Sequence, residues 1–239
     1  MRAGVCDGFI GNRILTQYRR AADHLLLDGA DFAEIDAALE AFGFAMGPFA
    51  VSDLAGLDIA KATRDRKAAT RPASERYSRV ADLICDQGWY GRKTGQGYYL
   101  YDNGKATGPN PGAMEIVKAE RQALGLRPQR FTPDDIVARC LTAMIAEATR
   151  VIEEGIALRP VDIDAVELFG YGFPRHRGGP MLQADLIGPE TLIQRIETYA
   201  KDDPQFWQVP ALLRHMQRDK RSFAEMNSGP NTTEKGQAS

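Results

Sequence analysis

Apolar residues recur at three- and four-residue intervals along two long stretches of the chain. The first stretch carries Ile14, Leu15, Tyr18, Ala22, Leu25 and Leu26. The second carries Leu141, Met144, Ile145, Ala148, Val151 and Ile152. This interval places the side chains on one face of an α-helix, so the pattern predicts two long amphipathic helices. Gly29 and Gly155 follow the two stretches, where a glycine commonly ends a helix.

The turn and cap residues after the two stretches also match, which indicates that the halves of the chain are diverged copies of one unit. Residues 13–56 align with residues 139–188. Matched segments include Ile35-Asp36-Ala37 with Ile163-Asp164-Ala165, Gly47-Pro48 with Gly179-Pro180, and Asp53-Leu54-Ala55-Gly56 with Asp185-Leu186-Ile187-Gly188. Chance similarity of two helices does not explain this match, because Gly, Pro and Asp mark turns and caps rather than general apolarity.

Shorter elements follow each long helix in the same order. Asp31 and Glu34 have the spacing of a capping box, which predicts a second helix from Ile35 to about Phe42. A Gly-Pro loop and a short helix come next in each copy. The chain does not alternate strands with helices, so the pattern excludes a doubly wound nucleotide-binding fold. We therefore predict an all-α protein of two tandem helical units packed as a pseudo-dimer, with no Rossmann domain.

The segment between the copies is less regular. Residues 64–80 are basic and polar and predict a loop, and Tyr98–Tyr101 is a strand-like run. Helices are predicted over 80–87 and 113–124. We divide the chain into a first helical unit (4–102), a linker with a helix (103–132), a second helical unit (133–223) and a disordered tail (224–239), the last because it lacks apolar content.

Composition narrows the function classes. The 239 residues are 44% hydrophobic and 26% charged, which is the balance of a globular protein. The net charge of −2 provides no basic field for nucleic acid or anionic lipid, and no apolar run reaches the roughly 20 residues of a membrane span. The three cysteines form no CxxC pair and lie far in sequence from the three histidines, so we expect reduced thiols and no metal site.

The segment Asp7–Arg13 opens the first long helix and contains a candidate functional amide, Asn12. An amide in this first turn can point at a substrate carbonyl or a catalytic side chain, and it can equally satisfy local backbone groups. The second copy has Ala138 at the matching position but keeps the neighbouring arginine as Arg139. An amide that the fold required would be expected in both copies, so its loss from one copy favours a role outside the fold.

Two glycine-rich loops each allow two interpretations. The loop Gly43–Phe49 either lines a ligand cleft or only joins two helices. The loop Gly91–Tyr99 superficially resembles a phosphate loop, but its residue order is wrong for GxxxxGK[ST] and no strand precedes it. Its cations Arg92 and Lys93 either meet a phosphate or are solvated. His176 is a candidate general base, but no carboxylate near it in sequence would orient it, which favours a surface or interdomain contact.

Four phrases, in this order and spacing, resemble the C-terminal region of 3-hydroxyacyl-CoA dehydrogenases: CDGFIGNR, AFGFAMGPFAVSDLAGLD, GRKTGQGYYLYD and GYGFPRHRGGPM. They are most similar to the multifunctional fatty-acid β-oxidation enzymes that fuse an enoyl-CoA hydratase to the dehydrogenase, of the peroxisomal type and its bacterial relatives. The resemblance covers residues 4 to about 223.

The resemblance implies an enzyme that oxidises L-3-hydroxyacyl-CoA to 3-ketoacyl-CoA with NAD. In this family a Rossmann domain holds NAD and supplies a His–Glu pair and a Ser, while the helical C-terminal domain closes over the acyl-CoA and places an Asn close to the catalytic His. That Asn matches Asn12, which we predict to be catalytic. The predicted contacts to the acyl-CoA substrate are Phe9, Met46, Gly47, Pro48 and Lys93.

The sequence departs from the family in lacking a GxGxxG after a strand and any hydratase-type segment. We therefore expect NAD to bind an upstream Rossmann domain of the same polypeptide, next to a hydratase domain, and we expect this chain alone to hold no cofactor and to be inactive. The alternatives are a non-catalytic helical module that binds acyl-CoA or a partner, and a purely structural assembly domain. A 6-phosphogluconate-type dehydrogenase domain is a weaker rival because it lacks the MGPF and KTGQGYY phrases.

The C-terminal residues bear on location. Gln237-Ala238-Ser239 is not an SKL-type peroxisomal signal. The expected location is therefore a bacterial cytoplasm, with the peroxisome as the alternative.

Overall fold

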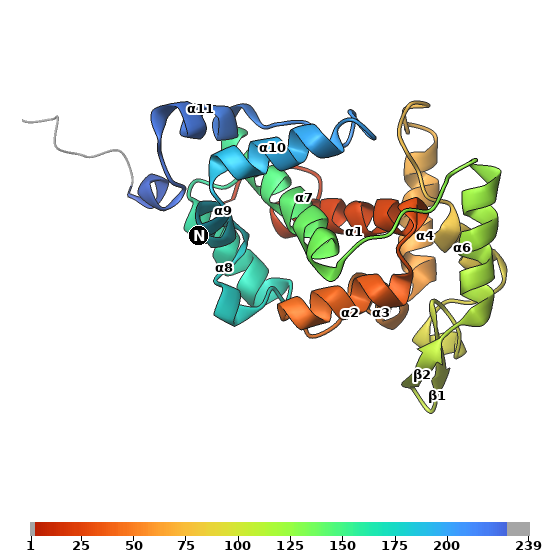
Figure 1. The fold of residues 1–239 in the computed structure, drawn as a ribbon. Coiled ribbons are helices and arrows are strands. Elements are labelled where there is room, and N and C mark those ends of the chain that lie inside the picture. The colour runs from red at the N-terminus through yellow and green to blue at the C-terminus, as the bar shows by residue number, and fades with distance from the viewer. Residues whose placement is uncertain (1–2, 229–239) are drawn as a thin grey trace, which may run out of the picture. The chain divides into compact units, whose positions relative to one another are not determined.

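The computed structural model describes residues 3–228 and is mainly helical (Figure 1). The helices are α1 (Gly11–Asp28), α2 (Phe32–Phe42), α3 (Pro48–Ala55), α4 (Leu57–Ala68), α5 (Val80–Asp86), α6 (Pro111–Ala123), α7 (Pro133–Glu153), α8 (Pro160–Gly170), α9 (Pro180–Ile187), α10 (Pro189–Tyr199) and α11 (Ala211–Asp219). Short 3-10 turns are η1 (Arg92–Thr94), η2 (Arg175–Arg177) and η3 (Ala224–Asn227). Strands β1 (Tyr99–Asp102) and β2 (Lys105–Pro109) pair antiparallel and form the one sheet among the described residues. The predicted helical fold is confirmed.

The described residues form two compact units. Unit 1 comprises the chain up to Gln17 together with the chain from Leu141 onward, and unit 2 comprises Tyr18–Cys140. The boundaries fall inside α1 and α7, so each long helix contributes to both units. Unit 2 therefore contains most of the first sequence copy. Unit 1 contains the second copy and, in addition, the short segment that carries Asn12.

The core of unit 2 uses the apolar faces that the sequence pattern predicts for its first two helices. Its buried residues include Tyr18, Leu25, Leu26, Phe32, Ile35 and Leu39. The ring of Tyr98 lies 5.5 Å from that of Phe32 and 4.7 Å from that of Phe49, measured between centroids. The residues just before β1 are thus part of this core, as are α2 and the first turn of α3.

Unit 1 repeats the arrangement with later helices. Its buried residues include Met144, Ile145, Ala148, Val151, Ile163, Phe173 and Met181. Along the chain α8 corresponds to α2, α9 to α3 and α10 to α4, and η3 takes the place that β1 has in the first copy. This element-by-element correspondence agrees with the duplication seen in the sequence.

The segment predicted as a linker, 103–132, contains more structure than expected. It includes β2 and α6, and α6 buries Ala113, Val117 and Arg121. Arg121 donates hydrogen bonds to the carbonyl oxygens of Leu26 (2.9 and 2.6 Å) and Ala30 (2.9 Å). A cation at this end of α1 satisfies carbonyl groups that the helix leaves without partners and complements its dipole. The segment is therefore part of unit 2 and not a spacer.

Two other boundaries differ from those predicted. The loop expected from residue 64 begins after α4, which continues to Ala68. The tail expected to be disordered from residue 224 begins with η3, because the N–H groups of Phe223 and Ala224 donate to Asp185 and the Val161 N–H donates to Asn227. The rest of the expected tail, 229–239, lies outside the described residues.

Candidate functional site

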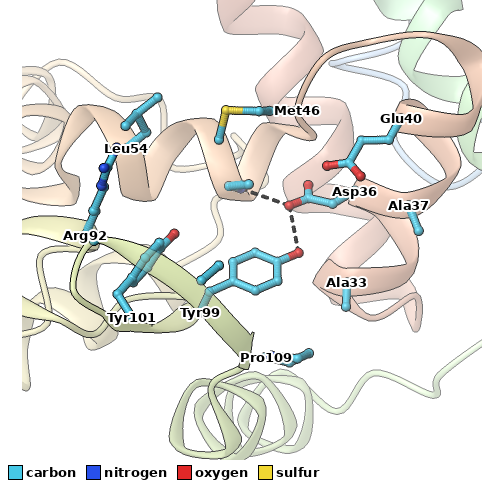
Figure 2. A pocket seen from close by; sticks show the side chains of 13 residues that line it. Ala33, Asp36, Ala37, Glu40, Met46, Leu54, Arg92, Tyr99, Tyr101 and Pro109 are labelled. Carbon is cyan, nitrogen blue, oxygen red and sulfur yellow. Dashed lines mark hydrogen bonds between the residues drawn. The ribbon is translucent and has the colours of Figure 1, made fainter.

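Two buried aspartates organise the loops that the sequence motifs identify. Asp36, in α2, accepts hydrogen bonds from the N–H groups of Phe49 (3.0 Å) and Ala50 (2.9 Å). These donors belong to the first turn of α3, where N–H groups have no intrahelical partner, so Asp36 caps that helix. The Tyr99 hydroxyl donates to the same carboxylate at 2.8 Å (Figure 2). Burial raises the pKa of Asp36 to about 6, against the lowering effect of these three donors.

Asp53, near the end of α3, holds the hairpin in a similar way. It is fully buried and accepts hydrogen bonds from the N–H groups of Tyr98 (3.0 Å) and Tyr99 (2.9 Å) and from the hydroxyl of Tyr101 (3.1 Å). Burial raises the pKa of Asp53 to about 6. Tyr99 connects the two carboxylates, since its N–H donates to Asp53 and its hydroxyl donates to Asp36. The two aspartates thus join α2, α3 and β1 into one framework.

The glycines of the two motifs leave space for these carboxylates. A Cβ on Gly47 would lie 2.2 Å from Oδ1 of Asp36, and a Cβ on Gly97 would lie 2.1 Å from Oδ1 of Asp53. Gly47 has φ −75°, which any residue adopts, so it is the close approach that requires a glycine. Pro48 occupies the first turn of α3, where its missing N–H costs nothing. Gly47 and Pro48 therefore have a structural role in joining α2 to α3.

The second copy contains the corresponding pair of carboxylates. Asp164 accepts hydrogen bonds from two N–H groups at the start of α9 (2.7 and 3.2 Å), and Asp185 accepts from the N–H groups of Phe223 (2.6 Å) and Ala224 (2.8 Å). A Cβ on Gly179 would lie 2.3 Å from Oδ1 of Asp164, which matches the packing of Gly47. The same contacts recur in both copies, which identifies them as features of the duplicated fold.

Asn12 lies in the first turn of α1, within unit 1, and its side chain is exposed. The turn that precedes it is unusual, because Phe9 has φ +50°, a conformation that costs a non-glycine residue energy and tends to occur at functional sites. The Phe9 side chain is 54% exposed, whereas Ile10 is buried and anchors the turn. The structure therefore places Phe9 and Asn12 on one short, exposed turn.

The remaining predicted substrate residues lie in unit 2. Met46 lines a cleft of about 500 Å³, together with Asp36, Glu40, Arg92 and Tyr99. Figure 2 shows these side chains around it. Lys93 lies outside this set and forms a half-exposed ion pair with Asp58 of α4. Thus Met46 borders a cleft, Lys93 forms a surface ion pair, and Asn12 and Phe9 belong to the other unit.

The structure also places the histidine and the cysteines that the sequence brought into consideration. His176 is exposed in η2, and the cysteines Cys6, Cys85 and Cys140 are free thiols. Within residues 3–228 no cluster of three or more His, Cys, Asp or Glu side chains has the geometry to hold a metal ion. No helix in this range is long and apolar enough to cross a bilayer.

A buried carboxyl in α8 has no counterpart in the sequence predictions. Glu167 is 1% exposed, and its Oε1 has no hydrogen-bond partner among the described residues. Burial, with a smaller effect from Asp164, raises the pKa of Glu167 to about 8. An unpaired carboxylate is costly in an apolar interior, so the folded chain holds this group as the neutral acid at pH 7.

Glu167→Gln should therefore remove a pH dependence of stability. The raised pKa means that folded Glu167 keeps its proton between about pH 4.5 and 8, where the unfolded chain loses it, so its contribution to the free energy of unfolding falls as pH rises through this window by at most about 1.4 kcal/mol per unit. Both proteins are unfolded in urea from pH 5 to 8.5 in a Trp89→Phe background, so that Trp207 fluorescence reports unit 1. The difference between the two pH profiles isolates the contribution of Glu167, because the other groups titrate in both proteins. Parallel pH profiles would show that Glu167 is ionised in the folded chain.

Comparison with known proteins identifies the family. The sequence matches the family model described as 3-hydroxyacyl-CoA dehydrogenase, C-terminal domain, twice, over residues 8–101 and 136–229. The chain belongs to this family. The first match includes Asn12, Asp36 and Asp53, and the second includes Asp164 and Asp185, so the two matches follow the two sequence copies.

Curated relatives of this 3-hydroxyacyl-CoA dehydrogenase domain are multifunctional enzymes. The chain is 43% identical over 209 residues to a peroxisomal bifunctional enzyme of Danio rerio, with 82% of this chain covered, and 40% identical over 219 residues to that of Homo sapiens, with 86% covered. It is 32% identical over 235 residues to a peroxisomal fatty acid beta-oxidation multifunctional protein of Oryza sativa, with 97% covered. The aligned region is 29%, 30% and 32% of these three relatives, so the chain spans about a third of their length or less.

Solved structures share the fold. The dehydrogenase part of multifunctional enzyme 1 from C. elegans matches with a TM-score of 0.69 at 24% identity, covering 89% of this chain and 48% of that one. The 3-hydroxybutyryl-CoA dehydrogenase from Escherichia coli matches with a TM-score of 0.68 at 20% identity, covering 95% of this chain and 62% of that one. At these identities the matches establish the fold of the helical domain and no more.

Proposed function

We propose that this chain is the substrate-side helical part of a multifunctional β-oxidation enzyme that oxidises L-3-hydroxyacyl-CoA to 3-ketoacyl-CoA with NAD. The family match and the names of the relatives support the reaction class. The observation that carries the role of this chain is the exposed amide of Asn12 on a fixed turn at the start of α1.

The chemistry of the reaction suits an amide at this position. Oxidation removes a hydride from C3 of the substrate and a proton from its hydroxyl. The Asn12 amide both donates and accepts hydrogen bonds and stays neutral across the physiological pH range. It can therefore orient the substrate oxygen, or the imidazole that receives the proton, without adding a competing charge.

The described residues do not fit NAD. A dinucleotide fold needs a parallel sheet with a glycine-rich turn between a strand and a helix. Residues 3–228 contain one antiparallel hairpin, and η1 follows a loop and not a strand. We therefore propose that a Rossmann domain of the same polypeptide binds NAD, alongside a hydratase domain.

Asn12→Ala in the full-length enzyme should lower kcat about a hundred-fold and leave the Kd for NAD unchanged, because the substitution removes one positioned hydrogen-bonding group and does not alter the dinucleotide site. NADH formation with a 3-hydroxyacyl-CoA measures kcat, and fluorescence titration measures NAD binding. Gln17→Ala, further along α1, is the control and should retain kcat. Normal turnover in the Asn12 variant would refute the assignment.

The alternative of a non-catalytic acyl-CoA-binding module makes a different prediction for this chain by itself. Calorimetric titration of the chain with acetoacetyl-CoA would show saturable binding if the module acts alone, with the cleft lined by Met46 as its site in unit 2. We propose instead that the complete acyl-CoA site also needs the NAD-binding domain, so the isolated chain should show neither binding nor turnover.

The location of the parent enzyme stays a prediction. Several relatives are named as peroxisomal or glyoxysomal proteins. We retain the bacterial cytoplasm as the proposed location, with the peroxisome as the alternative.

A further inference from the structure

The segment that carries Asn12 is attached to the second sequence copy. The Gly4 N–H donates to the carbonyl oxygen of Ile156 at 2.8 Å, and Ala3 forms a β-bridge with Ala157. All of these residues belong to unit 1. The residues that precede α1 therefore run beside the segment that follows α7. Further contacts with the second copy are made by the residues on either side of Asn12.

Arg13, directly after Asn12, is held by Glu147, within the last two turns of α7, and by Glu154, directly after α7. Its Nε donates to Glu147 at 2.8 Å, and its two terminal nitrogens donate to the two carboxylate oxygens of Glu154 at 2.5 and 3.0 Å. The Arg13 and Glu147 side chains are 17% and 8% exposed, and the Glu154 side chain is 48% exposed. A planar guanidinium with both ends engaged has little freedom to rotate, so this contact fixes the direction of the first turn of α1.

Gly11, directly before Asn12, is covered by Tyr171 from the end of α8. A Cβ on Gly11 would lie 2.0 Å from Cε2 and 2.3 Å from Cζ of the Tyr171 ring. The ring therefore lies against the α-carbon of Gly11, and no larger residue fits at this position while the ring stays in place. Tyr171 thus limits the movement of the turn by direct contact with its backbone.

Comparison of the two copies distinguishes contacts that stabilise the common fold from contacts that support Asn12. The aspartate contacts recur in both copies, but the residues that contact the turn of Asn12 are not the same types in the two copies. Aligned with the second copy, Gly11 and Asn12 face Val137 and Ala138. Glu147 and Glu154 face Ala21 and Asp28, Tyr171 faces Phe42, and Asp28 pairs with Arg76 instead. The residues aligned with the contacts of Gly11 and Arg13 are therefore of different types in the other copy, with alanine in place of Glu147 and phenylalanine in place of Tyr171.

We infer that the second copy positions the Asn12 amide, through Tyr171 against Gly11 and through Glu147 and Glu154 on Arg13. This inference rests on the proposed function of Asn12. The three side chains act through the backbone on either side of Asn12 and are positioning residues. A displacement of about 1 Å in a reacting group can reduce the rate about a hundred-fold, which is why such support affects turnover.

The test uses Tyr171→Ala and Arg13→Lys in the full-length enzyme. Each variant should lower kcat about ten- to hundred-fold with a smaller effect on the KM for NAD, because the amide is displaced while the dinucleotide site is not. Tyr171→Phe keeps the ring that covers Gly11 and should recover the kcat that Tyr171→Ala loses. The matched control is Arg139→Ala, which removes the aligned arginine of the second copy and should retain kcat.

A double-mutant comparison separates positioning from general loss of structure. If Tyr171 and Arg13 act through Asn12, neither substitution should lower kcat further in an Asn12→Ala background. Equal losses in both backgrounds would show that the effect does not pass through Asn12 and would overturn the inference. Wild-type kcat in both single variants, with Asn12→Ala still impaired, would overturn it while leaving the proposed function intact. Wild-type kcat in Asn12→Ala would refute the proposed function itself.

Discussion

Asp53→Ala should lower the free energy of unfolding of unit 2 by about 3–5 kcal/mol. Asp53 is fully buried and accepts hydrogen bonds from two N–H groups and the Tyr101 hydroxyl. Alanine leaves these three donors without their acceptor, and each unsatisfied buried donor costs about 1–3 kcal/mol. The Tyr98 N–H is buried, whereas the donors of Tyr99 and Tyr101 are part-buried beside the cleft, so they contribute at the low end of this range. Because Asp53 connects α3 to β1, the loss should also detach the hairpin from unit 2.

The two tryptophans allow this effect to be assigned to one unit. Trp89 lies in unit 2 and Trp207 in unit 1, so urea unfolding of a Trp207→Phe background reports unit 2 alone. Asp185→Ala, the aligned substitution in the second copy, is the control. It removes two backbone contacts from a half-exposed carboxylate, so its cost should be smaller and should fall on unit 1. Equal, small effects of both substitutions would show that water replaces the Asp53 carboxylate.

Local patterns predict much of this fold because they act over a few residues. The three- and four-residue intervals locate α1 and α7, and the capping box of Asp31 and Glu34 is present, with the Asp31 N–H donating to Glu34 at 3.0 Å. The hairpin was a local signal that we missed. Asn103 and Gly104 both have positive φ and form the two-residue turn between β1 and β2, which is a common hairpin signature.

The parts of the fold that local patterns do not predict depend on contacts between residues that are distant in the chain. Nothing near Asp36 or Asp53 in sequence shows that their partners are the first turn of α3 and the residues at 98–101. The sequence around Arg121 likewise does not show what it binds, because its acceptors lie in α1 and just after it. The sequence gives one signal for these contacts, which is that Asp36 aligns with Asp164 and Asp53 aligns with Asp185. Aspartates that survive in both copies of a diverged fold indicate a structural role.

The candidate site also has one part that the sequence predicts and one part that it does not. Asn12 could be predicted from the sequence because it matches the asparagine of the family and because the second copy has Ala138 at the aligned position. The residues that support Asn12 could not be predicted from the sequence, because Tyr171 and Glu154 lie more than a hundred residues away from it in the chain. The duplication supplies the missing argument once the contacts are known, since it shows which of them are asymmetric.

Gly47→Ala should lower the free energy of unfolding of unit 2 by about 3 kcal/mol, although its backbone suits any residue. The new Cβ would lie 2.2 Å from Oδ1 and 2.3 Å from the α-carbon of Asp36. The second contact is with backbone and cannot be relieved by a change of side-chain rotamer, so α2 and α3 must separate. That movement also takes Asp36 away from the N–H groups of Phe49 and Ala50, and the cap of α3 is lost.

A comparison of two glycines tests this steric argument. The three atoms nearest to a Cβ on Gly97 are all side-chain atoms of Asp53, the first at 2.1 Å, whereas a Cβ on Gly47 also lies 2.3 Å from the α-carbon of Asp36. Gly97→Ala should therefore cost little in an Asp53→Ala background, while Gly47→Ala should stay costly in an Asp36→Ala background. Gly170→Ala places its Cβ in open space and should change the stability of unit 1 by about 0.5 kcal/mol or less. If Gly47→Ala were equally neutral, α2 and α3 would have room that the structure does not show, and the close approach of Gly47 to Asp36 would be wrong.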